Sequence, residues 1–402
     1  IHMPYEERDA GRPMKKRPVY QKQKELGALF GLSYGWEHPL WFAGSGKKPS
    51  ESYGFKRQEW WDQVKFECNN LRKNVGIIDV SNFAKYEIKG SGSSNWIDQI
   101  FANHVPKKIG NTCLTPLIGS RGGVAGDFTV TKLDHEHFFI IGSGVAERYH
   151  SRYFKMLKKP SNLSFSSVTE DFGGFNLAGP KSRELLSRLT QEDLSTENWK
   201  FMKSRRITVS GIDAVAIRIS FTGDLGWEIY APINQQLKLY EALLNAGKDL
   251  KVKPVGSRSL LSLRVEKGYG SWGREYSPEY WPHEVGLDSL IKLEKPSFLG
   301  KGSYISVYKR PPREKLVMLE ILTENADASG GEPIFLKDGT PVGQVKSGAF
   351  SHTCQKSLAL SMINSEYVSL NQTFDVAVMG KSNKAFILAN PPFDPEGKRL
   401  RA

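Results

Sequence analysis

The clearest pattern of apolar and polar positions lies in the middle of the chain. Residues 214–220 alternate as a half-buried strand does, and residues 233–246 have the apolar spacing of a helix. Between them, residues 221–226 include two glycines and an aspartate, which is typical of a tight connection. A single carboxylate, Glu228, follows among large apolar side chains. This pattern predicts a strand, a turn, a second strand and a helix.

Other segments extend this mixture of helices and strands. The spacing predicts an amphipathic helix over 60–73, two short strands within 77–88, and a hairpin with strands at 128–133 and 138–141. From about residue 315 the chain contains only short alternating runs, at 316–321, 333–336, 342–347, 357–362 and 374–378. Regular short strands with Gly and Pro turns predict a small barrel. We therefore expect an α+β protein with a C-terminal β-barrel.

The first 57 residues show little periodicity. They are rich in Pro, Gly and charged residues, and only residues 18–29 suggest a short helix. A segment of this composition needs another surface to lie on. We therefore expect residues 1–57 to form an extended connector.

Composition is that of a soluble globular protein. The chain has 402 residues, enough for two or three cores, with 39% hydrophobic and 25% charged residues. No apolar run approaches the ~18 residues of a membrane span, and the start does not resemble a signal peptide. Cys68, Cys113 and Cys354 are far apart in sequence. They predict reduced thiols in a cytosol-like compartment.

The net charge of +13 raises the question of an anionic partner. The basic residues are dispersed, and no nucleic-acid-binding motif accompanies them, so we predict no nucleic-acid and no membrane partner. We also predict no metal site. The cysteines lack ligand spacing, and His135 and His137 lie on a predicted hairpin turn where they look solvated.

Glu228 has two interpretations. If its side chain points inward, burial requires a partner with matched donors, and a flat heterocycle with two adjacent N–H groups would supply one. If it points outward from an edge strand, it is simply hydrated, because alternation places half of a strand's residues in water. The residues alone leave both open.

The segment 221–232, FTGDLGWEIYAP, resembles the signature of the aminomethyltransferase (glycine cleavage T-protein) superfamily. That resemblance implies a folate-binding fold of mixed and antiparallel sheets with helices, followed by a small barrel. It also implies that the Glu of this motif, Glu228, grips the pterin ring of tetrahydrofolate. The "LAGP" element at 177–180 and the "SLRVEKG" element at 262–268 are similar to the same family.

Asp127 lies in the segment 126–130, GDFTV, where glycines predict a turn just before a strand. Taken alone, it is a turn residue whose side chain caps the turn. The segment resembles the dimethylglycine oxidase and dehydrogenase branch, in which the Asp lies beside the reactive folate nitrogens. Asp127 is therefore the expected catalytic residue, and Thr129 is expected to line the folate site.

Four further residues follow from the resemblance. Phe221 stands where relatives have a Tyr, so a stacking face remains while a hydroxyl donor is lost. Leu114 replaces another Tyr of the family. Arg264 is expected to contact folate or a neighbouring acid, although by itself it could be a structural ion pair. Trp272 could form an aromatic wall or belong to the core.

The first 57 residues resemble the middle segment of dimethylglycine and sarcosine dehydrogenases, which joins a flavin domain to a folate domain. We therefore expect a connector at 1–57, a folate-binding region at 58–312 and a barrel at 313–402. The dinucleotide fingerprint is absent from this sequence. FAD is thus expected only in a partner domain or subunit.

The resemblance implies a tetrahydrofolate-dependent one-carbon acceptor. It would capture the iminium or formaldehyde unit from oxidised dimethylglycine or sarcosine as 5,10-methylenetetrahydrofolate, with or without a polyglutamate tail on the folate. The expected compartment is the cytosol, or the mitochondrial matrix in a eukaryote. Two alternatives stay open: a flavin-independent demethylase of a sulfonium or methoxy substrate, and a non-catalytic regulatory relative.

Overall fold

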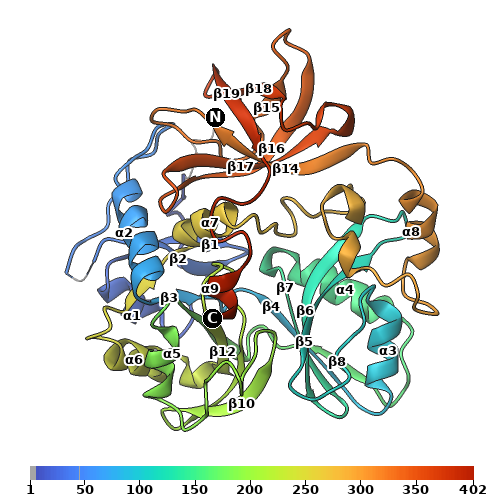
Figure 1. Ribbon diagram of the computed structural model, residues 1–402. Helices are drawn as coiled ribbons and strands as arrows, with labels where there is room; N and C mark the ends of the chain where they lie inside the picture. The colour runs from blue at the N-terminus through green and yellow to red at the C-terminus, as the bar shows by residue number, and fades with distance from the viewer. Residues whose placement is uncertain (1–5, 45) are drawn as a thin grey trace.

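The computed structural model describes residues 6–44 and 46–402. Figure 1 shows a barrel lying above two sheet-containing halves, with the C-terminal helix between the three parts. The sheets are a two-stranded hairpin, a six-stranded sheet, a five-stranded sheet and a closed six-stranded barrel. The expected α+β class with a C-terminal barrel is confirmed. In the described part of the chain, no helix combines the length and apolar character needed to cross a membrane.

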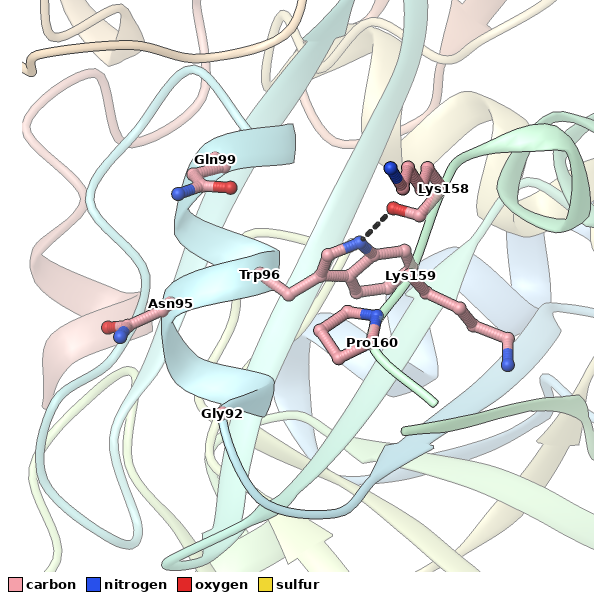
Figure 2. A pocket seen from close by; sticks show the side chains of 7 residues that line it. All are labelled: Gly92, Asn95, Trp96, Gln99, Lys158, Lys159 and Pro160. Carbon is pink, nitrogen blue, oxygen red and sulfur yellow. Dashed lines mark hydrogen bonds between the residues drawn. The ribbon is translucent and has the colours of Figure 1, made fainter. Parts of the chain in front are cut away.

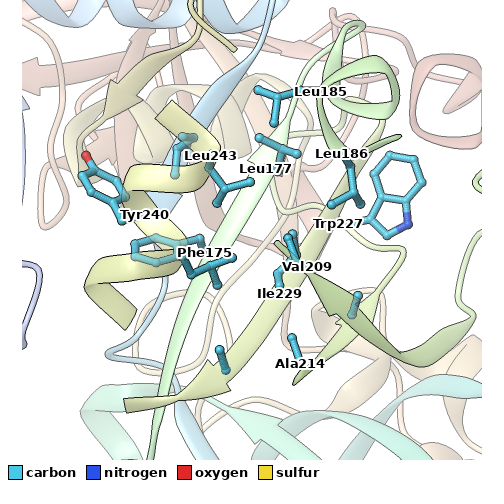
Figure 3. Close-up of a cluster of buried hydrophobic side chains, with 14 of the residues drawn as sticks. Phe175, Leu177, Leu185, Leu186, Val209, Ala214, Trp227, Ile229, Tyr240 and Leu243 are labelled. Carbon is cyan, nitrogen blue, oxygen red and sulfur yellow. The ribbon is translucent and has the colours of Figure 1, made fainter. Parts of the chain in front are cut away.

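The six-stranded sheet has the order β10-β11-β12-β9-β3-β13, so β12 is an interior strand. Its strands are β3 (Gly76–Asp79), β9 (Phe172–Ala178), β10 (Ser204–Val209), β11 (Ile212–Ile217), β12 (Gly226–Pro232) and β13 (Lys253–Val255). Trp227 and Ile229 point from β12 into one core, which helix α6 covers with Tyr240 and Leu243 (Figure 3). Alternation along β12 therefore sends Glu228 to the opposite face.

Short helices cover this sheet and join it to the rest. They are α5 (Ser182–Ser187), η2 (Ile233–Gln235), α6 (Gln236–Ala246) and α7 (Ser257–Glu266). The predicted helix over 60–73 is confirmed as α2 (Trp60–Lys73), whose Val64, Cys68 and Leu71 face the core. Their spacing by four and three residues puts these side chains on one side of the helix.

The five-stranded sheet has the order β5-β6-β7-β4-β8. Its strands are β4 (Ala84–Lys89), β5 (Thr112–Ile118), β6 (Val124–Asp134), β7 (His137–Gly142) and β8 (Ser164–Ser167). One face packs against α3 (Ser93–Ile100) and α4 (Glu147–Met156), and η1 (Gly144–Ala146) directly precedes α4. The predicted hairpin is confirmed as β6–β7, but β6 begins four residues earlier than expected. His137 starts β7 and lies 2.8 Å from Glu87, so its predicted solvated position is wrong.

The first 57 residues are more structured than the sequence predicts. After α1 (Tyr20–Glu25), the antiparallel strands β1 (Ala28–Ser33) and β2 (Trp36–Phe42) form a hairpin where no strand was expected. Its alternation is interrupted by Pro39 and by a register shift between Leu29 and Phe30. The hairpin buries Leu40 and Trp41 in the core shared with α2. Long-range burial thus orders a segment whose local pattern is weak.

The barrel closes in the order β14-β17-β16-β15-β18-β19. Its strands are β14 (Glu314–Ile321), β15 (Pro333–Phe335), β16 (Pro341–Ser351), β17 (Lys356–Asn364), β18 (Thr373–Val378) and β19 (Lys381–Leu388). The five predicted strands are present, and β19 was missed. Only Ala385 of β19 is fully buried, so its alternation is faint in the sequence.

The remaining elements link these parts. They are η3 (Pro282–Glu284), η4 (Asp288–Leu290), α8 (Lys301–Tyr308), η5 (Ser365–Tyr367) and α9 (Lys398–Arg401). The chain leaves the barrel after β19 and returns to the six-stranded sheet (Figure 1). There α9 contacts the end of α2, because Arg399 Nη2 donates to the carbonyl oxygen of Arg72 at 2.6 Å.

Candidate functional site

Glu228 lies on the interior strand β12 and is 6% exposed. The interpretation of a hydrated edge residue is therefore excluded. Its Oε2 accepts a hydrogen bond from the Tyr230 hydroxyl at 2.7 Å, and no protein donor to Oε1 is found in the described residues. Burial raises the pKa of Glu228 to about 7, although Tyr230 and the charge of Lys85 oppose this. One oxygen of a desolvated carboxyl group thus remains available to a ligand.

Asp127 is the fourth residue of β6 and pairs with Pro116 of β5. The prediction of a turn boundary is wrong, because the strand continues through this position. Its Oδ1 is buried and has no hydrogen-bond partner among the described residues. Burial raises the pKa of Asp127 to about 7, and the negative charge of Glu275 adds to the increase. A carboxyl group in this state can exchange a proton near neutral pH.

The two acids face the same space between the two sheets. Asp127 and Thr129 alternate with the core residue Phe128, so they lie on the other face of the five-stranded sheet. On that face Thr129 is opposite Ile141 of β7. Two residues along β7, Phe139 contacts the Tyr230 ring at 5.6 Å. Since Tyr230 holds Glu228, the structure places Asp127, Thr129 and Glu228 around one inter-sheet region.

Phe221 and Arg264 line a cavity of about 330 Å³. Phe221 stacks on Tyr269 with ring centroids 5.8 Å apart. The other lining residues are Glu7, His38, Leu40, Phe83, Ser257, Arg258, Leu260, Leu261, Ser271 and Arg274. Three arginines line this cavity, but Arg258 and Arg264 are paired with Glu51 and Glu275, and burial lowers the pKa of His38.

Arg264 is held mainly by the protein itself. Its Nη1 donates to the carbonyl oxygen of Tyr269 at 2.7 Å and to Glu275 at 3.2 Å, and its Nη2 donates to Ser347 at 2.7 Å. The expected contact with a neighbouring acid is present. Because these bonds engage both terminal nitrogens, Arg264 orients the cavity wall more than it offers free donors.

Trp272 lies at the start of β6, and Leu114 lies beside the middle of this strand. The Trp272 indole donates to the carbonyl oxygen of Val124 at 3.3 Å and stacks on Tyr149 at 5.4 Å. Leu114 of β5 is paired with Thr129 and is 43% exposed. The residue that departs from the family pattern therefore adjoins a predicted site residue.

Sequence reasoning missed three residues of this region. Tyr230 was detectable, since alternation puts it on the same face as Glu228, two residues away. Lys85 is fully buried, and its ammonium group donates to the carbonyl oxygens of Ser81 and Phe83, each at 2.7 Å. Glu275 lies in a loop with no local signal. Tertiary packing alone brings Lys85 and Glu275 to the site.

A second cavity lies elsewhere. It has a volume of about 440 Å³ and is bounded by α3 and the segment after α4, where the Trp96 indole donates to the carbonyl oxygen of Lys158 at 2.9 Å (Figure 2). None of the predicted site residues lines it. The described residues also contain no group of three or more His, Cys, Asp or Glu that could hold a metal ion.

Two known domain families match this chain, in the same order as the sheet-containing region and the barrel. The GCVT N-terminal domain model matches residues 19–295, and the glycine cleavage T-protein C-terminal barrel domain model matches residues 314–394. The chain belongs to the glycine cleavage T-protein family. It is therefore an aminomethyltransferase-type module, as the FTGDLGWEIYAP motif predicted.

Individual relatives agree with this membership. Mouse (Mus musculus) mitochondrial dimethylglycine dehydrogenase is 34% identical over 404 residues, covering 100% of this chain and 46% of that protein. An aminomethyltransferase of Desulfitobacterium hafniense is 29% identical, covering 96% of this chain and 99% of that protein. The chain thus spans about half the length of its dimethylglycine dehydrogenase relatives. The crystal structure of glycine cleavage system aminomethyltransferase T from Bartonella henselae has the same fold, with a TM-score of 0.83 at 21% identity, covering 95% of this chain and 99% of that one.

The family implies the use of tetrahydrofolate, and the residues present fit such a ligand. Oε1 of Glu228 has no protein donor in the described part of the chain, and Oδ1 of Asp127 is buried without a partner there. Both acids face the same region, which also contains aromatic rings. A flat ligand with N–H donors would satisfy groups that the protein leaves unpaired.

Proposed function

We propose that this chain is a tetrahydrofolate-binding one-carbon acceptor module. It captures the one-carbon unit released by oxidation of dimethylglycine or sarcosine, giving 5,10-methylenetetrahydrofolate. The observation that supports it is the pair of buried acids, Asp127 and Glu228, which face one region between two sheets and each keep an oxygen without a donor among the described residues. When bound, tetrahydrofolate supplies the nitrogens that accept the carbon.

Glu228 is proposed to bind the pterin ring. A carboxylate can accept two adjacent N–H groups in a fork, and charge-assisted bonds of this kind contribute about 1.5–3 kcal/mol each. Tyr230 fixes the orientation of the carboxyl group from one side. Because the pKa of Glu228 is raised, its carboxyl group is protonated at acidic pH, and it must lose this proton before it can accept the N–H donors.

Asp127 is proposed to act at the reacting nitrogens. Its position on β6, rather than on a turn, gives it a rigid support. There it either stabilises developing positive charge or relays a proton. Thr129, Phe221 and Trp272 are proposed to line the folate site, with Arg264 orienting its wall.

The partner is proposed to be a flavin-binding oxidoreductase domain or subunit. The support is partial coverage: the chain matches only 46% of a protein named dimethylglycine dehydrogenase. The other half of such a protein would generate the one-carbon unit, and a shared assembly would protect that reactive unit from water.

Calorimetric titration of the purified chain with tetrahydrofolate tests the proposal. We expect binding in the wild type and a loss of about tenfold to a hundredfold in Glu228→Gln, the size of one charge-assisted bond. Glu241→Gln, an acid whose side chain is 45% exposed, should bind like the wild type. Absence of binding by the wild type would refute the proposed function.

The pH dependence of the tetrahydrofolate affinity, measured by the same titration, gives a second test. Because folate donors favour the carboxylate, affinity should fall about tenfold for each pH unit below about 7, where Glu228 is protonated. Glu228→Gln should remove this dependence. A wild-type affinity independent of pH below neutrality would exclude Glu228 as the acceptor.

A further inference from the structure

Two neighbouring polar side chains interrupt an apolar row across the six-stranded sheet. Glu228 of β12 is paired with Ile217 of β11 on one side and with Asn176 of β9 on the other. Asn176 is paired in turn with Ile78 of β3. Residues paired in this way have their side chains on the same face of the sheet. The two isoleucines at the ends of the row belong to a hydrophobic core, whereas Glu228 and Asn176 lie side by side between them.

Asn176 is 2% exposed, and its amide group is held in one orientation. Its Nδ2 donates to the carbonyl oxygen of Ile219 at 3.3 Å, and its Oδ1 accepts from the Ser220 hydroxyl at 3.2 Å. Because a backbone carbonyl can only accept, the amide nitrogen cannot exchange places with the amide oxygen. An amide nitrogen carries two N–H groups, so one N–H of Asn176 has no acceptor among the described residues.

Glu228 and Asn176 are complementary, but they are not bonded to each other. Directly opposite residues of an antiparallel pair have Cβ atoms about 4.5–5.5 Å apart, so the two side chains are immediate neighbours. A buried carboxyl group and a buried N–H that served only the fold would be expected to pair, because each is costly to leave unpaired. Instead, Glu228 is bonded to Tyr230 of its own strand, and no hydrogen bond within the described chain joins it to Asn176. An acceptor and a donor thus remain side by side for a third group.

The edge of a pterin ring carries the matching groups in the matching order. Its 2-amino group and the adjacent ring N–H are donors, and the 4-oxo oxygen next to them is an acceptor. A carboxylate can take the two donors, and an amide N–H on the neighbouring strand can take the acceptor. The spacing of neighbouring strands, about 4.8 Å, is close to the length of this edge.

We propose that Asn176 is a second pterin-binding residue, whose unpaired amide N–H donates to the 4-oxo oxygen while Glu228 accepts from the adjacent N–H groups. The inference rests on the proposed function, because it adds a contact at the same site. Since Ile219 and Ser220 fix the amide nitrogen as a donor, a 4-amino ring would place two donors against each other. Asn176 therefore selects a 4-oxo pterin over a 4-amino pterin.

The test is a calorimetric titration of the full chain with tetrahydrofolate and with tetrahydroaminopterin, the analogue that has an amino group at the 4-position. In Asn176→Leu, which keeps the size but removes the donor, affinity for tetrahydrofolate should fall about tenfold, the contribution of one hydrogen bond. Affinity for the analogue should not fall, because its 4-amino group accepts nothing from Asn176. The analogue also lacks the ring N–H, but this difference cancels when the ratio of the two affinities is compared between proteins. Asn371→Leu, at an exposed residue before β18, should leave both affinities unchanged.

A second measurement reports on the contact in the wild type itself. A hydrogen bond lowers the infrared stretching frequency of a carbonyl group, and an isotope label at carbon 4 identifies this band in bound tetrahydrofolate. We expect the wild-type band to lie below its frequency in a solvent without hydrogen-bond donors, and to rise in Asn176→Leu. If that variant does not fold, Asn176→Ala takes its place, and the wild-type band requires no variant.

Three results overturn the role of Asn176. They are an affinity ratio in Asn176→Leu equal to the wild-type ratio, a wild-type carbonyl band at the frequency of an unbonded group, and a band that the substitution leaves unchanged. A purely structural role would weaken both ligands alike and would not move the band. If one of these results is found while Glu228→Gln still weakens binding, the proposed function stands and only this contact fails. Absence of tetrahydrofolate binding by the wild type removes the proposed function, and this contact with it.

Discussion

Replacement of Arg72 by methionine should destabilise the protein more than loss of any exposed ion pair. Arg72 of α2 donates to Asp224 at 2.5 Å, to Glu266 at 2.5 and 3.0 Å, and to the carbonyl oxygen of Thr222 at 2.8 Å. The side chains of Arg72, Asp224 and Glu266 are 5%, 1% and 0% exposed. This cluster joins α2 to α7 and to the turn before β12.

The expected loss of stability depends on the partners that Asp224 and Glu266 keep after the substitution. Asp224 keeps Arg399, whose Nε lies at 2.6 Å. Glu266 keeps the hydroxyl groups of Ser351 and Thr353, but no other cation of the described chain is paired with it. Removing one partner of a buried ion pair costs about 3–5 kcal/mol, because a charge is left uncompensated. We expect Arg72→Met to lie in that range.

Urea unfolding followed by tryptophan fluorescence measures this change, with the midpoint shift multiplied by the wild-type slope. The matched control is Arg188→Met, whose side chain is 35% exposed and whose partners Glu184 and Asp249 are 55% and 68% exposed. The control should cost about 0–1 kcal/mol. Adding Glu266→Gln to Arg72→Met should cost less than the sum of the two single changes. Equal midpoint shifts for Arg72→Met and Arg188→Met would refute the reasoning.

Two further changes test other buried charges. Burial opposes ionisation of Glu87, but hydrogen bonds from His137 and a neighbouring lysine outweigh it and hold the pKa of Glu87 at about 2. A carboxyl group whose pKa is lower in the folded state than its unfolded value of 4.5 stabilises the fold at pH values above 4.5. The difference in melting temperature between wild type and Glu87→Gln should therefore shrink as the pH falls from 4.5 towards 2. A difference that stays constant would contradict this. Lys295 donates to three carbonyl oxygens within residues 98–103, at 2.6–2.9 Å. Lys295→Met should cost at least about 1–3 kcal/mol in urea unfolding, because buried acceptors lose their donor, whereas the exposed Lys107→Met should cost nothing measurable.

The sequence was informative where structure is local. The spacing over 60–73 predicted α2 to the residue, and short alternating runs predicted five of the six barrel strands. Two glycines and an aspartate marked the turn before β12. The motif at 221–232 identified the family, because its residues are contiguous and their chemistry is specific. Each of these features depends on neighbours within a few residues.

The sequence was misleading where long-range contacts override the local pattern. Residues 28–42 form a hairpin because the buried Leu40 and Trp41 join a distant core, not because their pattern alternates. Asp127 looked like a turn residue because glycines precede it. The position of β6 was decided by pairing with β5 and β7 along its length.

The sequence by itself determined several of the helices, most of the strands, the barrel and the family of this protein, but not α4, α8 or α9. It also gave the identity of the two acids, Asp127 and Glu228. Only the tertiary structure decided that these acids face one region and that Tyr230 orients one of them. Periodicity encodes which side of an element is apolar, whereas the neighbour across a buried space depends on how distant segments pack together.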